Sequence, residues 1–136
     1  MIKANELMIG NLLRDKVSGA ILRVDELTVE GKIITYVIDR KLFPLPNGWQ
    51  AEPIPLTEEV LLKCGFEKSN HNNKSIIGYD LNEIYRVYSE KSNYEFWILD
   101  RDYEEVAYCK LSKVEYIHQL QNLYFALTGH PLTIKI

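Results

Sequence analysis

The chain has 136 residues, of which 46% are hydrophobic and 26% are charged, and its formal net charge is −3. These values are typical of a globular protein and exclude a disordered or fibrous chain. No apolar run approaches the ~20 residues needed to cross a bilayer, and Glu6 lies where a secretion signal would have its apolar stretch. We therefore expect a cytoplasmic protein.

The first 55 residues are predicted to form a run of short strands. The expected strands cover residues 11–14, 20–25, 27–30, 32–38 and 50–54. Gly19 and Gly31 mark turns between them. Because such a meander exposes fewer strand edges when it closes on itself, we predict a small SH3-like β-barrel for residues 1–55. Residues 42–49 are predicted to form a loop that ends in Trp49, which either contacts a ligand or packs onto the barrel.

A short helix is predicted over residues 57–64. Thr57 can cap its first turn, and Glu58 and Glu59 favour the positive end of the helix dipole. Gly65 suits the left-handed residue that ends a helix.

Antiparallel strands are predicted to resume after a polar loop, over residues 75–79, 83–88, 94–99 and 103–109. In the third of these, both faces are largely apolar, which indicates a central strand. In the second, Arg86 and Tyr88 alternate with apolar positions, which indicates one wetter face. Six of the nine tyrosines lie in this region, where they can anchor a protein interface or stack on bases, with Arg86, Lys91 and Lys110 nearby.

The longest helix is predicted over residues 113–128. Ser112 and Glu115 have the spacing of a capping box, and Gly129 ends the helix. Residues 132–136 are predicted to form a last strand. The fold class is therefore α+β: an N-terminal SH3-like β-barrel, residues 1–55, followed by an antiparallel sheet packed against one long C-terminal helix, residues 56–136, in one compact structure.

A second group of side chains lies beside the apolar stripe of this helix. It consists of Val114, His118, Gln121 and Phe125. These residues either pack within the chain or form a subunit interface, since aromatic and amide groups suit a self-complementary contact. With Trp49, they are the candidate contacts of a non-catalytic protein-binding module that associates with itself or with another protein.

The alternative function is nucleic-acid binding by the predicted barrel. It requires five basic residues to converge on one face: Arg14, Lys16, Arg23, Arg40 and Lys41. The net charge argues against it, because the chain has no basic stripe of the kind that displaces counterions from phosphate.

No sequence motif indicates catalysis, a cofactor or a metal. His71, His118 and His130 have no partner at ligand spacing, and the chain has no phosphate-binding glycine loop. The acidic residues 100–105 do not match a calcium-binding loop, so a solvated turn is expected there. Cys64 and Cys109 are expected to be buried free thiols. An enzyme is the least favoured class.

Two stretches resemble a family of small proteins encoded by phages, prophages and mobile elements of Bacteroides-type bacteria. These are residues 55–66 (PLTEEVLLKCGF) and 114–129 (VEYIHQLQNLYFALTG), and such proteins typically begin with a stretch like residues 4–11. The family has no established activity or catalytic residue. The resemblance implies a bacterial cytoplasm and an accessory role, without a mechanism.

Overall fold

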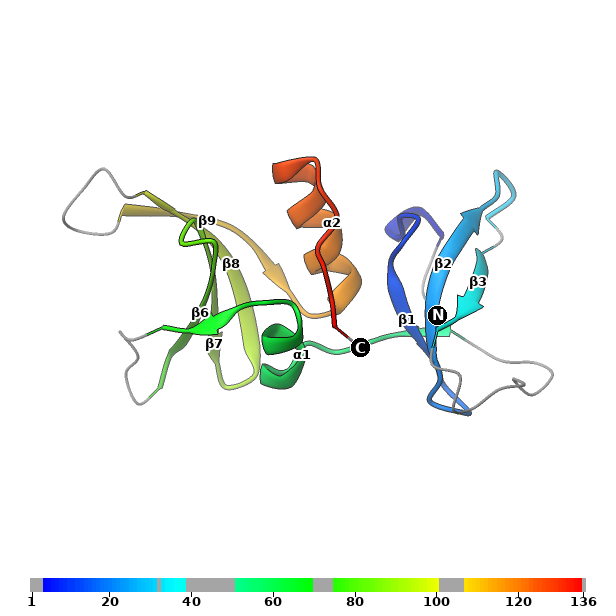
Figure 1. The fold of residues 1–136 in the computed structure, drawn as a ribbon, viewed down its shortest axis with the longest axis horizontal. Helices are drawn as coiled ribbons and strands as arrows, with labels where there is room; N and C mark the ends of the chain where they lie inside the picture. The colour runs from blue at the N-terminus through cyan, green and yellow to red at the C-terminus, as the bar shows by residue number, and fades with distance from the viewer. Residues whose placement is uncertain (1–3, 32, 39–50, 70–74, 101–106, 136) are drawn as a thin grey trace. The chain divides into compact units, whose positions relative to one another are not determined.

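The computed structural model describes residues 4–31, 33–38, 51–69, 75–100 and 107–135. The protein is α+β, with two antiparallel sheets and a C-terminal helix (Figure 1). Its elements are η1 (Ala4–Glu6), β1 (Leu12–Asp15), β2 (Ile21–Leu27), β3 (Ile33–Val37), β4 (Ala51–Pro53), α1 (Glu58–Lys63), β5 (Glu67–Lys68), β6 (Ile77–Leu81), β7 (Tyr85–Glu90), β8 (Asn93–Asp100), β9 (Ala107–Val114) and α2 (Ile117–Thr128).

The chain divides into two compact units. The first unit is Met1–Pro55 with Tyr116–Leu132, and the second is Leu56–Glu115 with Thr133–Ile136. The boundary after residue 55 coincides with the predicted one. The assignment of helix α2 to a unit differs from the prediction. The helix belongs to the first unit, whereas the sequence analysis placed it in the unit that contains the second sheet.

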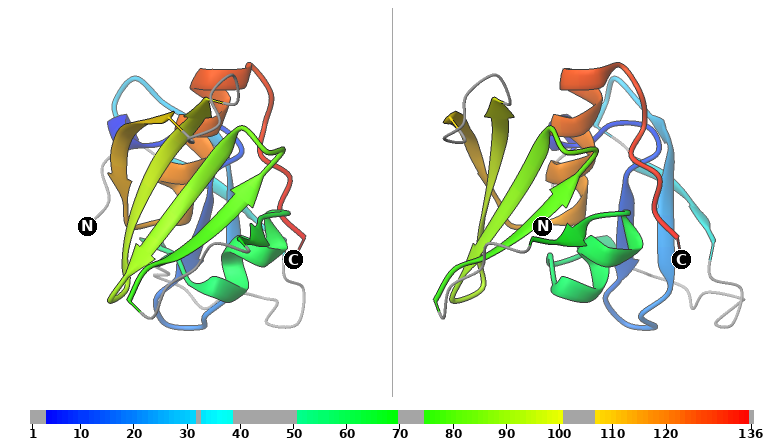
Figure 2. Two further views of the ribbon diagram at one scale, coloured as in Figure 1. Left: turned by 90° about the vertical axis from the view of Figure 1, so that its left-hand side faces the viewer. Right: turned by 60° about the vertical axis from the view of Figure 1, so that its left-hand side comes forward.

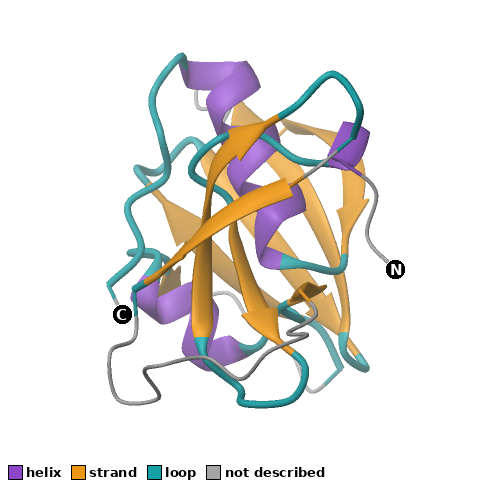
Figure 3. Ribbon diagram, turned by 90° about the vertical axis from the view of Figure 1, so that its right-hand side faces the viewer, coloured by secondary structure: helices purple, strands orange, loops and turns teal. Residues whose placement is uncertain are grey.

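The first unit is built on a four-stranded sheet in the order β3-β2-β1-β4 (Figure 3). Leu22 and Val24 are buried at alternate positions of β2, and they form a core with Leu13 of β1 and with Leu7. Leu13 lies opposite Leu22 in the antiparallel register. Among the described strands, β3 and β4 are the two unpaired edges, so this sheet is open and the SH3-like barrel stays a prediction. The predicted loop 42–49 lies outside the described residues.

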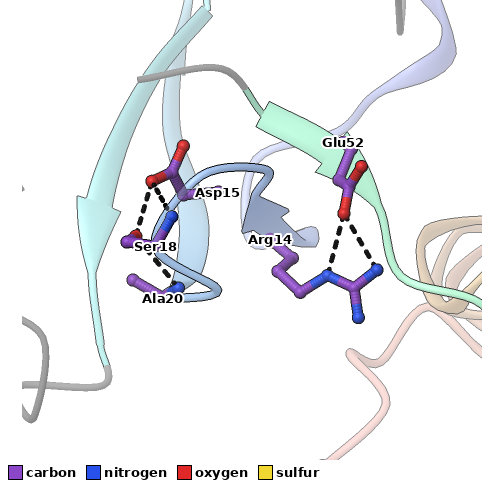
Figure 4. Close-up of polar contacts among 5 residues, drawn as sticks. All are labelled: Arg14, Asp15, Ser18, Ala20 and Glu52. Carbon is purple, nitrogen blue, oxygen red and sulfur yellow. Dashed lines mark hydrogen bonds and ion pairs between the residues drawn. The ribbon is translucent and has the colours of Figure 1, made fainter. Parts of the chain in front are cut away.

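The turn between β1 and β2 is held by a buried carboxylate. Asp15 accepts hydrogen bonds from the backbone N–H of Ser18, at 3.0 Å, and from the Ser18 hydroxyl (Figure 4). The Ser18 hydroxyl oxygen in turn accepts from the backbone N–H of Ala20, at 3.2 Å. Gly19 has φ +77°, a left-handed conformation that glycine adopts without steric cost, as the predicted turn requires.

The helix α2 begins four residues later than predicted. Residues 113 and 114 extend β9 instead, with Lys113 opposite Glu95 in β8. The predicted capping box therefore does not form, and the Ser112 hydroxyl donates to the carbonyl of Lys113 at 2.9 Å. A local helix signal was overridden by a strand pairing that is distant in sequence.

The second unit is built on a five-stranded antiparallel meander in the order β5-β6-β7-β8-β9 (Figure 2). One face of the sheet carries Tyr79, Val87 and Phe96, which are all buried. The helix α1 ends close to β6, because a Cβ on Gly65 would lie 3.6 Å from Leu81 Cδ1. The apolar face of this sheet is the core of the second unit.

The helix α1 has the caps that its sequence predicts. The Thr57 hydroxyl oxygen accepts from the N–H of Val60, at 3.2 Å. At the other end, Phe66 N–H donates to Leu61 O and Gly65 N–H donates to Leu62 O, both at 3.1 Å. These two bonds form a Schellman motif, and its usual apolar contact is available because Leu61 and Phe66 are both buried.

The C-terminus does not form the predicted last strand. Residues 131–135 have no regular secondary structure, and Lys135 N–H donates to Lys63 O at 2.9 Å. The segment is therefore attached to the end of α1 by a backbone hydrogen bond and adds no strand to a sheet.

The two-residue turn between β7 and β8 is strained. Lys91 and Ser92 have φ values of +50° and +64°, and Glu90 pairs with Asn93 across the turn, as in a type I′ hairpin. We expect Lys91→Asn with Ser92→Gly to raise the free energy of unfolding by about 1 kcal/mol, because these residues adopt left-handed conformations at less cost. Urea denaturation measures this gain. Lys91→Ala is the control and should give no stabilisation, and an equal gain from it would contradict the explanation.

Candidate functional site

The strand register places a polar set of side chains on one face of the five-stranded sheet. Adjacent side chains in a strand point to opposite faces, and the paired residues extend each face from β6 to β9. We call this set the polar face, and it consists of Asp80, Arg86, Tyr88, Glu95, Trp97, Lys110 and Lys113.

Arg86 and Asp80 form a partly buried ion pair at the β6–β7 side of the polar face. They lie directly opposite each other. Arg86 Nε donates to Asp80 Oδ1, and a terminal guanidinium nitrogen donates to Asp80 Oδ2 at 2.9 Å. Only 10% of the Arg86 side chain is exposed. The hydrogen bonds to Asp80 raise the pKa of Arg86, although burial acts in the opposite direction, so the guanidinium is always charged.

Gly78 makes room for this arginine. A Cβ at position 78 would lie 3.2 Å from Arg86 Cδ, which is closer than ordinary van der Waals contact. The φ of Gly78 is unremarkable for a strand, so the requirement for glycine here is one of space and not of backbone conformation. A small residue opposite Tyr88 therefore lets the arginine side chain lie flat across the strand.

Tyr88 and Trp97 form an ordered aromatic pair beside the arginine. Arg86 donates to the Tyr88 hydroxyl at 2.9 Å, and its guanidinium carbon lies 5.4 Å from the centre of the Tyr88 ring. The Tyr88 and Trp97 rings meet edge to face, with centroids 5.8 Å apart. Both rings are half-buried, so they present aromatic surface whose orientation is already set by neighbouring side chains.

The β9 side of the polar face carries two exposed lysines. Lys110 Nζ lies 2.6 Å from Glu95 Oε2, and its side chain remains 45% exposed. The register shifts between Phe96 and Trp97, so Leu111 is an extra residue in β9. This bulge brings Lys110 and Lys113 to the same face although they are three residues apart. No ion pair of Lys113 is found within the described part of the chain.

The described members of the predicted interface differ in exposure. Val114 and His118 are buried, whereas Phe125 is 42% exposed. The apolar stripe of α2 is buried only at its start, at Ile117 and Leu120, and Leu127 is exposed. Trp49 lies outside the described residues.

Gln121, another predicted interface residue, holds α2 onto the start of β1. Its Oε1 accepts from the backbone N–H of Leu12 at 2.9 Å, and its Nε2 donates to the carbonyl of Gly10 at 3.1 Å. Next to it, Asn122 Oδ1 accepts from Asn11 Nδ2 at 2.8 Å, and Asn11 is itself buried. These contacts are internal to the first unit, so the polar atoms of Gln121 are already used within the chain.

His118 is buried at the start of α2. Burial lowers its pKa, while the charge of Glu6 acts in the opposite direction. Its ring stacks on Tyr116 with centroids 5.7 Å apart, and its Nδ1 has no hydrogen-bond partner among the described residues. His71 is not described, and His130 is exposed after α2.

The predicted nucleic-acid contacts are partly neutralised. Arg14 and Arg23 share one face of the first sheet, but Arg14 lies 2.9 Å from Glu52 (Figure 4) and Arg23 lies 2.8 Å from Asp25. Lys16 is exposed in the turn after β1. The remaining two, Arg40 and Lys41, lie outside the described residues. The described part of this face therefore has no excess of positive charge at its arginines.

The two cysteines differ in accessibility. Both are free thiols, but only Cys64 is buried, and the prediction that Cys109 is buried too is wrong because the bulged edge strand β9 exposes it. Burial raises the pKa of the Cys64 thiol to about 12, which removes the reactive thiolate at neutral pH. We expect one thiol to react with Ellman's reagent in the native protein and two in denaturant. Cys109→Ser should abolish the native reaction, and a persistent signal would show that Cys64 is accessible.

Metal and membrane sites are not indicated by the described residues. Within them, no three histidine, cysteine or acidic side chains are grouped to hold a metal ion. The acidic turn 100–105 is described only at Asp100. No helix found in the described ranges has the length and apolar character to span a membrane.

Comparisons with known protein families, with curated proteins and with solved structures find no match. The candidate site therefore rests on its own geometry. The sequence indicates the tyrosines and Arg86 as surface groups but does not single out Trp97, Asp80 or Lys113. The alternation of Arg86 and Tyr88 with Tyr85 and Val87 was the available signal. The pairing of those residues with β6 and β9 was not visible in the sequence.

Proposed function

We propose that the chain is a non-catalytic protein-binding module whose contact surface is the polar face of the five-stranded sheet. The observation that carries the proposal is the ordered pair of half-buried rings, Tyr88 and Trp97, held in place by the buried Arg86. Tryptophan, tyrosine and arginine are the residues most enriched at interface hot spots. Their orientation is held by internal contacts, so a partner would pay little side-chain entropy to bind them.

The charges of the polar face favour a protein over a nucleic acid. Glu95 lies directly opposite Tyr88, and Asp80 lies opposite Arg86. A phosphate backbone that followed the aromatic rings would pass close to both carboxylates and lose part of its electrostatic attraction. A protein surface with its own mixture of charges can match this pattern.

The cellular setting belongs to the same proposal. The resemblance of residues 55–66 and 114–129 to proteins of phages and mobile elements supports an accessory role in a bacterial cytoplasm. The four short antiparallel strands of the first unit support an SH3-like architecture for it. In this view the first unit is a scaffold and the second sheet makes the contact.

Site-specific photo-crosslinking tests the proposal without disturbing the fold. A crosslinking amino acid at position 113, on the polar face, should form adducts with a protein when the chain is irradiated in a lysate of its native host. The matched control is position 16, which is also an exposed lysine but lies in the first unit. Adducts from position 16 alone would contradict the proposed surface.

Substitution of the aromatic pair gives a second test. Trp97→Ala should remove the adducts formed at position 113. Tyr36→Ala should leave them unchanged, because Tyr36 is also an exposed ring under an arginine, with Arg23 5.4 Å from its centre, but lies on the other sheet. Hydrogen exchange of β7 and β8 shows whether the Trp97→Ala sheet remains folded. Equal adduct yields from both variants would argue against the polar face.

A further inference from the structure

The β9 side of the polar face is positively charged because of a backbone irregularity. In a regular strand, residues three apart point to opposite faces. The bulge at Leu111 instead places Lys110 and Lys113 on the same face, opposite Trp97 and Glu95 respectively. Among the described residues, Glu95 is the one acidic side chain paired with them across β8, so the charge of this described group is positive even though the whole chain has a net charge of −3.

We infer that the partner of the polar face presents an acidic segment, whose carboxylates meet Lys110 and Lys113 and whose adjacent apolar or aromatic side chain packs on Tyr88 and Trp97. This inference rests on the proposed function and specifies the chemistry of the partner. Charge complementarity carries it: Lys113 has no acidic partner within the described part of the chain, and Lys110 keeps 45% of its side chain exposed after pairing.

The same features argue against addition of a strand to the edge of the sheet. β9 is an edge strand, with β8 as its neighbour (Figure 2). A bulge and exposed lysines are devices that prevent edge-to-edge pairing, because they interrupt the ladder and repel like charges. Two copies of this chain that paired through β9 would bring four lysines together. The acidic segment is therefore expected to lie over the face and to be bound through side chains.

Binding to an array of random-sequence peptides tests the inference. The intact protein should select peptides enriched in aspartate and glutamate. The double variant Lys110→Glu with Lys113→Glu should bind those peptides more weakly, by a factor of up to about five. The peptides that the double variant itself selects should be enriched in lysine and arginine. A selection by the intact protein that lacks acidic enrichment, or a double variant with an unchanged preference, would overturn the inference.

The array also separates this inference from the proposed function. Trp97→Ala should lose binding to peptides of every charge. If peptides without acidic enrichment are selected and are lost in Trp97→Ala, the protein-binding function stands and the acidic partner does not. If Trp97→Ala binds as the intact protein does, the proposed function fails. An oligothymidine probe on the same array tests the nucleic-acid alternative. Tight binding of this probe that is lost in Trp97→Ala would overturn both the protein-binding function and the acidic partner.

Discussion

Replacing Asp80 by alanine should lower the free energy of unfolding of the second unit by about 2–3 kcal/mol. The substitution leaves the Arg86 guanidinium charged and mostly buried, with two donors that no longer have a carboxylate acceptor. Loss of one partner of a buried ion pair costs several kcal/mol, and the 28% exposure of the Asp80 side chain reduces that figure here. Native-state hydrogen exchange of β6 and β7 measures the loss in this sheet separately.

The matched control for this substitution is Glu52→Ala in the first sheet. Arg14 and Glu52 also lie directly opposite each other on neighbouring strands. Here, however, Arg14 Nε and Nη2 contact the same carboxylate oxygen, Glu52 Oε1, at 3.0 and 2.9 Å (Figure 4). The Arg14 side chain is 40% exposed, so water can replace the lost contact. We expect a cost below about 1 kcal/mol. A similar cost for both variants would show that burial of Arg86 does not control the energy.

The Asp80→Ala result also bears on the binding surface. Arg86 orients Tyr88 through a hydrogen bond and a contact with its ring, and Tyr88 in turn meets Trp97. An arginine that has lost its carboxylate is free to leave this position. Partner binding should therefore weaken in Asp80→Ala even under conditions in which the sheet remains folded. Glu52→Ala should leave binding unchanged.

Replacing Gln121 by alanine should lower the free energy of unfolding of the first unit by about 2–3 kcal/mol. The side-chain amide satisfies the N–H of Leu12 and the carbonyl of Gly10, and Leu12 and the adjacent Asn11 are buried. Each buried backbone group left without a partner costs about 1–3 kcal/mol, and the higher helix propensity of alanine offsets only a few tenths of that. Urea denaturation followed by circular dichroism, with hydrogen exchange of β1, measures the effect.

Two further variants identify the cause of this destabilisation. Gln121→Glu keeps an acceptor for Leu12 but removes the donor to Gly10, so about half of the loss is expected. Gln119→Ala is the same substitution on an exposed turn of the same helix, where Gln119 accepts a hydrogen bond from Tyr116 N–H at 3.2 Å. Its cost should be about 1 kcal/mol or less. If Gln121→Ala instead leaves stability unchanged and abolishes partner binding, Gln121 is a surface contact after all.

Features that depend on neighbouring residues were predictable from the sequence. The helix α1, its Thr57 cap and its Gly65 terminus follow from residues within one or two turns of each other, and all three appear in the structure. Gly129 ends α2 in a left-handed conformation for the same reason. The alternation in residues 94–99 likewise indicated a central strand, and β8 lies between β7 and β9. Local sterics and capping determine such features, so no tertiary information is needed.

The candidate site depended on contacts between residues distant in sequence. Nothing near Arg86 in the chain shows that Asp80 lies opposite it or that Gly78 leaves space for it. The bulge at Leu111 changes the face on which Lys113 lies, and it arises from the pairing of β9 with β8. The sequence periodicity could identify a polar face but not which side chains meet on it.

The sequence by itself determined that this protein is α+β, with two helices that end at glycines and strands in a predictable order along the chain. The tertiary structure alone decided that α2 begins at Ile117, that it belongs to the first unit and that Gln121 is an internal contact. The physical reason is the same in each case. A capping box or an exposed amide side chain adds about 1 kcal/mol to the local stability of a helix. Extending the β8–β9 ladder and providing hydrogen-bond partners for buried backbone groups of β1 add more to the stability of the fold.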